Sequence, residues 1–161
     1  MRKYLIEIKW ALIFILVSLI WMGFEKIMGW HDSQIAKHPI YTNFFAIPAI
    51  LIYVFALLDK RNNYYNGYMN WIQGMICGAI ISFIVAIASP LTQLIVHKII
   101  SPSYFDNAIN YVVELGKMSE RQAADYFNLK AYMAQSAIST LGLGFFTSAI
   151  VSLFIRRKPT N

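Results

Sequence analysis

Residues 71–89 read WIQGMICGAIISFIVAIAS, a run without a charged side chain. A helix needs about 20 mostly apolar residues to cross the hydrocarbon core of a bilayer. Small residues also recur every four positions in this run, and that spacing places them on one face of a helix. The run therefore predicts a membrane-spanning helix with a smooth face for packing.

Other runs share this apolar character, and they cover about residues 6–28, 41–58 and 131–155. None shows the strict alternation of apolar and polar residues that marks a membrane β-barrel. Only 14% of the 161 residues are charged, whereas a soluble domain averages about a quarter. The sequence therefore predicts a single all-α membrane domain over residues 1–161, a bundle of four transmembrane helices with the lipid bilayer as its surroundings.

Residues 91–130 are predicted to form an extramembrane helical hairpin between the third and fourth spans. Pro90 should kink the third helix rather than end it, because the residues that follow stay apolar. Pro102 and Gly116 are expected at the start and the end of the first arm of the hairpin. The SERQ motif at 119–122 has the capping-box pattern that begins a helix, so the second arm should start there.

Lysine and arginine residues concentrate near the N-terminus, after the second span and at the C-terminus. Loops rich in these residues stay in the cytoplasm, so both termini are predicted to be cytoplasmic. Because these residues adjoin the apolar runs, they account for the net charge of +6 as membrane anchors. We therefore do not expect nucleic-acid binding.

The third and fourth spans each carry a stripe of small residues spaced four apart. The stripes consist of Gly74, Gly78, Ser82 and Ala86 in the third span, and of Ser136, Thr140, Gly144, Ser148 and Ser152 in the fourth. Close packing of small residues drives helix association in lipid. Two interpretations stay open: the stripes pack on each other within one chain, or one of them faces a second copy or a membrane partner.

His31, Asp32 and His38 lie in the loop between the first two spans. Imidazole and carboxylate groups together suit zinc or a similar metal, which makes these residues candidate metal ligands. Their spacing matches no compact metal motif, and the alternative is an ordinary role in loop and helix-cap structure. His97 is predicted on the same side of the membrane, but it would have to fold back from beyond Pro90 to join them.

Glu7 and Glu25 lie near the two ends of the first span. Their separation of 18 residues corresponds to roughly 27 Å along a helix, close to the hydrocarbon thickness of about 30 Å. Both are therefore expected to be interfacial anchors. The centres of the predicted spans hold no ionisable side chain. This composition argues against a transporter that couples to ions at the midplane.

Familiar enzyme motifs are absent, including HExxH, GxSxG and the phosphate loop, so no catalytic residue and no cofactor is predicted. The sequence favours a small, non-enzymatic membrane protein that acts through helix–helix contacts with itself or with a membrane partner. A small oligomeric transporter or channel is the alternative. A metal-binding role at the outer face is the third hypothesis.

Several segments occur in an order that resembles a known family: KYLIEIKWALIF at 3–14, EKIMGWHD at 25–32, HPIYTNFFAIPAILIYVFALLDKR at 38–61 and GKMSERQAADYFNLKAY at 116–132. The chain resembles the short four-span bacterial membrane proteins of domain of unknown function 4199, which are common in Bacteroidetes. The resemblance extends from about Lys3 to Arg157. It implies a four-span inner-membrane protein, and it implies no activity, substrate or catalytic residue.

Overall fold

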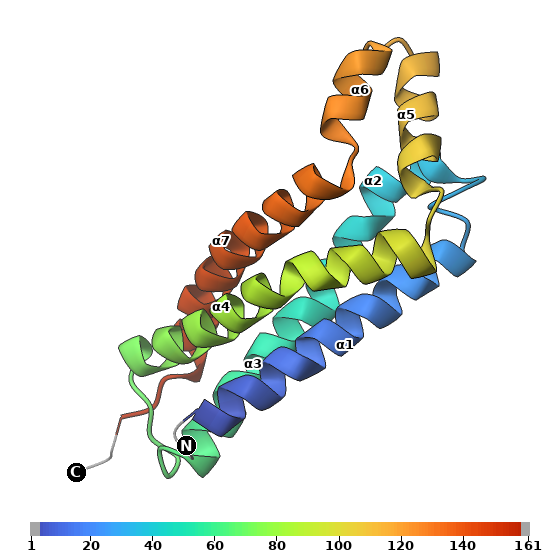
Figure 1. Ribbon diagram of the computed structural model, residues 1–161. Helices are drawn as coiled ribbons and strands as arrows, with labels where there is room; N and C mark the ends of the chain where they lie inside the picture. The colour runs from blue at the N-terminus through green and yellow to red at the C-terminus, as the bar shows by residue number, and fades with distance from the viewer. Residues whose placement is uncertain (1–3, 159–161) are drawn as a thin grey trace.

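The chain folds into a bundle of long helices with a short helical hairpin at one end (Figure 1). The computed structural model describes residues 4–158. The helices in this range are α1 (Leu5–Ile27), the 3-10 turn η2 (Ile35–Lys37), α2 (His38–Tyr41), the 3-10 turn η3 (Thr42–Phe45), α3 (Ala46–Asn63), α4 (Trp71–Ile95), the π-helical turn η4 (Val96–Ile100), α5 (Tyr104–Glu114), α6 (Glu120–Tyr126) and α7 (Leu129–Ile155).

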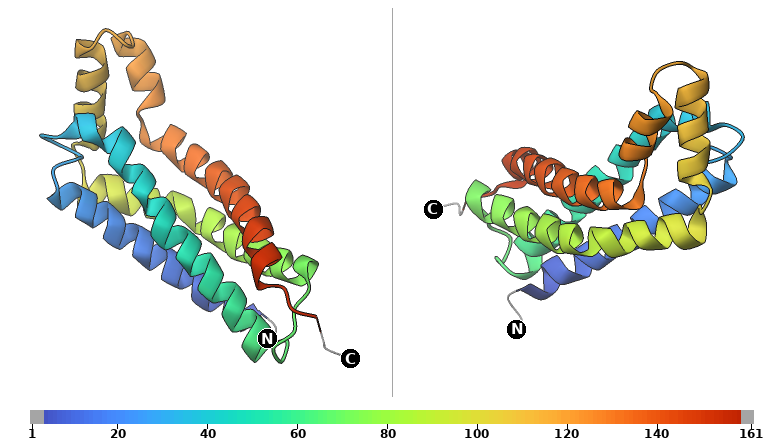
Figure 2. Two further views of the ribbon diagram at one scale, coloured as in Figure 1. Left: turned by 180° about the vertical axis from the view of Figure 1, so that it is seen from behind. Right: turned by 45° about the horizontal axis from the view of Figure 1, so that its top comes forward.

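Among the described residues, four helical segments are long and apolar enough to cross a membrane. They are Leu5–Ile27, Ile35–Asn63, Trp71–Ile100 and Leu129–Ile155. The predicted all-α, four-span architecture is confirmed, and so is the presence of short helices between the third and fourth spans. The start of α1 and the end of α7 lie at one end of the bundle, and α5 and α6 lie at the other (Figures 1 and 2). We refer to these as the terminus end and the cap end.

The third span is longer than predicted, because the helix continues through Pro90 as far as Ile100. Proline removes one backbone hydrogen bond and leaves the carbonyl four residues earlier without its partner. That carbonyl belongs to Ala86, and the Ser89 hydroxyl donates a hydrogen bond to it at 2.8 Å. The local repair, together with the apolar sequence that follows, keeps the span helical.

The hairpin signals in the sequence are confirmed at two positions. Ser119 caps α6 in a reciprocal capping box with Gln122. Gly116 follows the end of α5 with φ of +63°, a left-handed conformation that glycine adopts without steric cost. The fourth span does not continue from α6. Helix α6 ends at Tyr126, and Asn128 caps a new helix, α7.

The small-residue stripes of α4 and α7 face each other over the half of the bundle nearest the terminus end. A methyl group added to Gly74 would lie 2.6 Å from the Ser152 hydroxyl. One added to Gly78 would overlap Ser148. The Ser148 and Ser152 hydroxyls donate to carbonyls of their own helix at 2.5 and 2.6 Å, so the close contact leaves neither hydroxyl unpaired. How much stability this contact contributes stays a prediction.

Candidate metal site at the cap end

The loop after α1 turns back over the end of that helix. Gly29, with φ of +76°, supplies a backbone conformation that a side chain would disfavour. The amide of Trp30 then donates to the carbonyl of Glu25 at 3.0 Å. The Trp30 ring is buried and stacks on Tyr41, with ring centroids 4.6 Å apart. These contacts place His31 directly beside Glu25.

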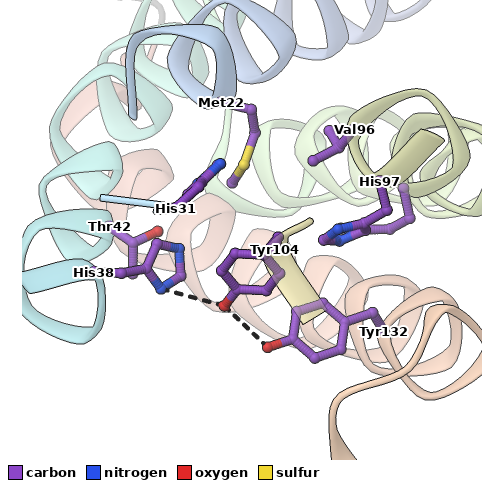
Figure 3. Close-up of a pocket in the computed structure, with 9 residues that line it drawn as sticks. Met22, His31, His38, Thr42, Val96, His97, Tyr104 and Tyr132 are labelled. Atoms are coloured by element: carbon purple, nitrogen blue, oxygen red, sulfur yellow. Dashed lines mark hydrogen bonds between the residues drawn. The ribbon is translucent and has the colours of Figure 1, made fainter. Parts of the chain in front are cut away.

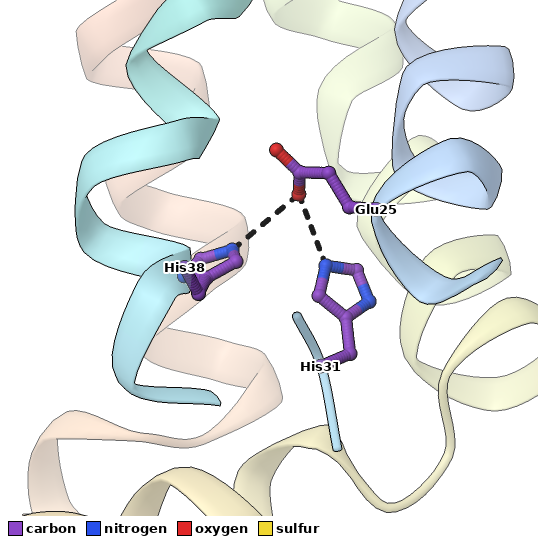
Figure 4. A group of neighbouring side chains, drawn as sticks. All are labelled: Glu25, His31 and His38. Carbon is purple, nitrogen blue, oxygen red and sulfur yellow. Dashed lines mark hydrogen bonds and ion pairs between the residues drawn. The ribbon is translucent and has the colours of Figure 1, made fainter. Parts of the chain in front are cut away.

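Glu25, His31 and His38 converge on one point inside the bundle (Figure 4). Glu25 Oε2 lies 3.0 Å from His31 Nε2 and 3.5 Å from His38 Nε2. The indole nitrogen of Trp21 donates to the other carboxylate oxygen of Glu25 at 2.6 Å. Glu25 and His31 are fully buried, and His38 is partly buried. The carboxylate is therefore held by the surrounding side chains rather than by water.

These residues match the ligand chemistry of a zinc site. One ligand atom from each residue lies within 4.8 Å of the others. In a tetrahedral site with bonds of about 2.0–2.1 Å, ligand atoms lie roughly 3.3 Å apart. The contacts of 3.0 and 3.5 Å bracket that spacing, so only a small adjustment would admit an ion. Two histidines and a glutamate also leave a fourth position open for another ligand.

A cavity of about 160 Å³ opens beside this cluster (Figure 3). Its lining combines side chains from α1, from the segment between α1 and α3, from the outer part of the third span, from the hairpin and from α7: Met22, His31, His38, Thr42, Gln93, Val96, His97, Tyr104 and Tyr132. Sites for organic ligands usually measure about 300–1,000 Å³. The cavity is thus better matched to an ion with a few water molecules.

Two tyrosines extend the polar contacts from the cluster across the cavity (Figure 3). The Tyr104 hydroxyl lies 3.3 Å from His38 Nδ1 and 3.2 Å from the Tyr132 hydroxyl. Burial raises the pKa of the Tyr104 phenol, so its hydroxyl stays protonated. In this arrangement the Tyr104 hydroxyl can donate to Nδ1 of His38, which leaves the hydrogen of that imidazole on Nε2, the atom that faces Glu25.

Asp32 does not join the cluster, although the sequence suggested it as a metal ligand. Its carboxylate pairs with Lys26 Nζ at 2.6 Å and accepts a hydrogen bond from the Asn107 amide at 3.1 Å. Asp32 instead ties the loop to α1 and to α5. Glu25 supplies the carboxylate among the clustered residues, and sequence analysis missed that role.

The expectation that both glutamates of α1 are simple interfacial anchors is also wrong. Glu25 and Glu7 are 0% and 1% exposed, and both point into the bundle. Their 18-residue separation equals five turns of 3.6 residues, which puts them on the same face of α1. That periodicity was the signal that could have identified them, because Ala11 on this face is also fully buried.

His97 reaches the cavity without folding back, because the third span stays helical through Pro90 and on to Ile100. All three histidines of the chain therefore line one cavity. Their rings do not all touch, since Tyr104 lies between His97 and the other two (Figure 3).

Over its described residues, the fold is that of a multi-pass membrane protein with four candidate spans and a buried Glu-His-His cluster at the cap end. The chain belongs to the family described as "Protein of unknown function (DUF4199)", which it matches over residues 9–157. No curated protein and no solved structure matches it.

Proposed function

We propose that this protein binds a divalent transition-metal ion at the cap end of the membrane bundle, with zinc as the best chemical fit. The convergence of Glu25, His31 and His38 within 4.8 Å carries the proposal. Ionisable groups are costly inside a membrane bundle, and those that occur there usually serve a function.

The burial of the cluster supports binding rather than a chance arrangement. Glu25 accepts from Trp21 and faces two imidazoles, so its negative charge is directed into the bundle. Nδ1 of His31 is buried and has no hydrogen-bond partner within residues 4–158. An ion bound to Nε2 of His31 would put the hydrogen of this imidazole on Nδ1, where an ordered water is a common partner. The small cavity favours a binding or sensing role over catalysis on an organic substrate.

The direct test is metal stoichiometry. The protein would be purified in detergent, stripped with a chelator, reloaded with zinc and analysed by mass spectrometry. We expect about one zinc ion per chain, and loss of that ion in Glu25→Gln and His38→Gln. Asp32→Asn is the matched control, since Asp32 is acidic and near the site but bonds to Lys26 and Asn107. Absence of zinc from the wild type, or loss in Asp32→Asn alone, would overturn the proposal.

The location of the protein is part of the same proposal. We infer a bacterial inner membrane with both termini in the cytoplasm, which puts the cap end on the outer side. The start of α1 and the end of α7 lie at one end of the bundle, which supports placing both termini on the same side of the membrane (Figure 1). Single cysteines at the exposed positions Ser33 and Lys158, introduced after Cys77→Ser, should react with an impermeant thiol reagent from opposite sides.

A second candidate function is helix–helix association with another copy or with a membrane partner. The observation that favours it is an apolar groove of about 420 Å³ between α4 and α7, lined by Ala79, Ser82, Phe83, Leu141, Gly142 and Phe145. Near the terminus end, the small residues of α4 and α7 already pack on each other within one chain. They are therefore not available there to contact a second copy or a partner. Cross-linking in native membranes should reveal a stoichiometric partner if it acts this way.

The transporter hypothesis requires a path formed between copies. Zinc flux into liposomes would support it. Zinc binding without zinc flux would contradict the transporter hypothesis and would be consistent with metal binding alone.

A further inference from the structure

Tyr104 occupies the centre of the three-histidine cavity (Figure 3). Its ring centroid lies 5.1 Å from those of His31 and His38 and 5.3 Å from that of His97. Tyr104 is the first residue of α5, so the hairpin inserts this ring into the bundle. The ring therefore separates His97 from the Glu25 cluster.

His97 presents a nitrogen that is ready to bind an ion. Its Nε2 lies 3.1 Å from the side-chain oxygen of Gln93, an acceptor that requires the hydrogen to be on Nε2. Nδ1 then carries a lone pair. This atom is buried and has no hydrogen-bond partner in the described part of the chain. Contacts of the Gln93 type are those that fix the tautomer of a metal-binding histidine.

The backbone at His97 is also unusual. Residues Val96–Ile100 form a π-helical turn, closed by a hydrogen bond of 2.7 Å from the amide of Ser101 to the carbonyl of Val96. Single π-helical turns are rare and occur frequently at functional sites. This turn re-aims the side chains at the end of the third span, where His97 lines the cavity.

Tyr104 is held in place by contacts that can be exchanged. Its hydroxyl lies 3.3 Å from His38 Nδ1 and 3.2 Å from the Tyr132 hydroxyl, and both contacts are longer than typical hydrogen bonds. The short segment 101–103 joins α5 to the third span, and Phe105 next to it stacks on His97 at 4.1 Å. A movement at the start of α5 would therefore withdraw Tyr104 and release the His97 ring together.

On the basis of the proposed function, we propose that His97 is a fourth protein ligand and that Tyr104, in the arrangement described above, blocks its access to the Glu25 cluster. Withdrawal of the Tyr104 ring lets His97 Nδ1 join Glu25, His31 and His38. Four protein ligands close the coordination sphere of zinc, as in structural sites rather than catalytic ones. Metal binding then displaces the start of the hairpin, which turns occupancy of the site into a change at the membrane surface.

The first experiment counts histidine ligands by X-ray absorption spectroscopy of the zinc-loaded protein. We expect three imidazoles in the wild type and two in His97→Gln, with Tm in the chelated state as the check that the variant folds. Two imidazoles in the wild type would overturn this inference and leave the proposed function intact. Absence of bound zinc would overturn the proposed function itself.

The second measurement tests the blocking role of Tyr104. Tyr104→Ala should bind zinc about tenfold more tightly, because the competent arrangement is no longer disfavoured in the free protein. Tyr104→Phe keeps the ring and should not gain affinity. Zinc should also speed hydrogen exchange at the amides of residues 101–107 in the wild type but not in His97→Gln. Weaker binding by Tyr104→Ala, or unchanged exchange, would contradict the blocking role.

Discussion

Helix α1 buries one glutamate near each of its ends, and the two are neutralised in different ways. At the terminus end, Glu7 Oε1 lies 2.8 Å from Lys60 Nζ, and that ammonium group also lies 3.8 Å from the ring centre of Tyr64. At the cap end, Glu25 faces His31 and His38. The same helix face thus carries a lysine-paired carboxylate and a histidine-paired one.

The difference lies in whether the basic partner of each glutamate can bind a metal ion. A lysine ammonium is a permanent charge near neutral pH and has no lone pair for a metal. An imidazole changes protonation in the physiological range and is the commonest metal ligand. At the terminus end, the Glu7–Lys60 ion pair therefore holds α1 against α3. The cap end holds a carboxylate whose partners can accept an ion in place of a proton.

The largest effect is expected from breaking the buried Glu7–Lys60 ion pair. Glu7→Ala leaves the Lys60 ammonium buried without its carboxylate, and removal of one partner from a buried pair costs about 3–5 kcal/mol. We expect that loss in the free energy of unfolding, measured by denaturant titration in detergent. The double variant Glu7→Leu with Lys60→Leu should recover most of it. Equal destabilisation of the single and double variants would show that the ion pair is not the cause.

The second-largest effect is expected from metal removal, which should destabilise the cap end and leave the terminus end unchanged. Zinc at 100 times its Kd should stabilise the wild type by about 2.7 kcal/mol, because it binds only the folded chain. A chelator should abolish that increment, and Glu25→Gln should lack it from the start. Zinc should still stabilise the double variant at Glu7 and Lys60. Loss of the zinc increment in that double variant would mean that the two ends are not independent.

A third prediction concerns the close contact between α4 and α7 in the half of the bundle nearest the terminus end. Gly78→Ala forces a methyl group against Ser148 and should cost about 1–3 kcal/mol, as overpacking usually does. Gly142→Ala is the matched control, because no atom lies within 4 Å of the added methyl group. Neither change should alter zinc affinity. Equal stability of the two variants would refute the close-packing interpretation of the stripes.

The smallest effect is expected from the second ion pair at the terminus end. Lys9 pairs with Asp59, but the Lys9 side chain is 53% exposed, whereas that of Lys60 is 3% exposed. An exposed pair contributes at most about 1 kcal/mol. Lys9→Met should therefore change the free energy of unfolding far less than Glu7→Ala does. A comparable loss would show that burial is not what distinguishes the two pairs.

Much of the fold follows directly from local sequence patterns. Apolar runs of the required length specify the spans, and Ser119 and Gly116 specify where the hairpin helices begin and end. The end of the third span was placed too early, at Ser89, because the Ser89 hydroxyl compensates the Ala86 carbonyl freed by Pro90 and the helix continues. Local signals work here because capping and bilayer length depend on neighbours in the chain.

The candidate site was predicted only in part. Its two histidines were identified from residue type and from their position between spans. The acidic partner was assigned to Asp32, the nearest acid in sequence, which instead bonds to Lys26 and Asn107. Sequence distance misleads in this case because the turn at Gly29 folds the loop back over α1, towards Glu25.

The sequence by itself determined that this is a four-span helical membrane protein, because hydrophobicity and periodicity are properties of single segments. Only the tertiary structure decided which polar side chains meet. Glu25, His31, His38, Tyr104 and His97 come from different segments and converge through packing of the loop, the third span and the hairpin. Their proximity depends on how complete helices and the loop are arranged, which no local pattern encodes.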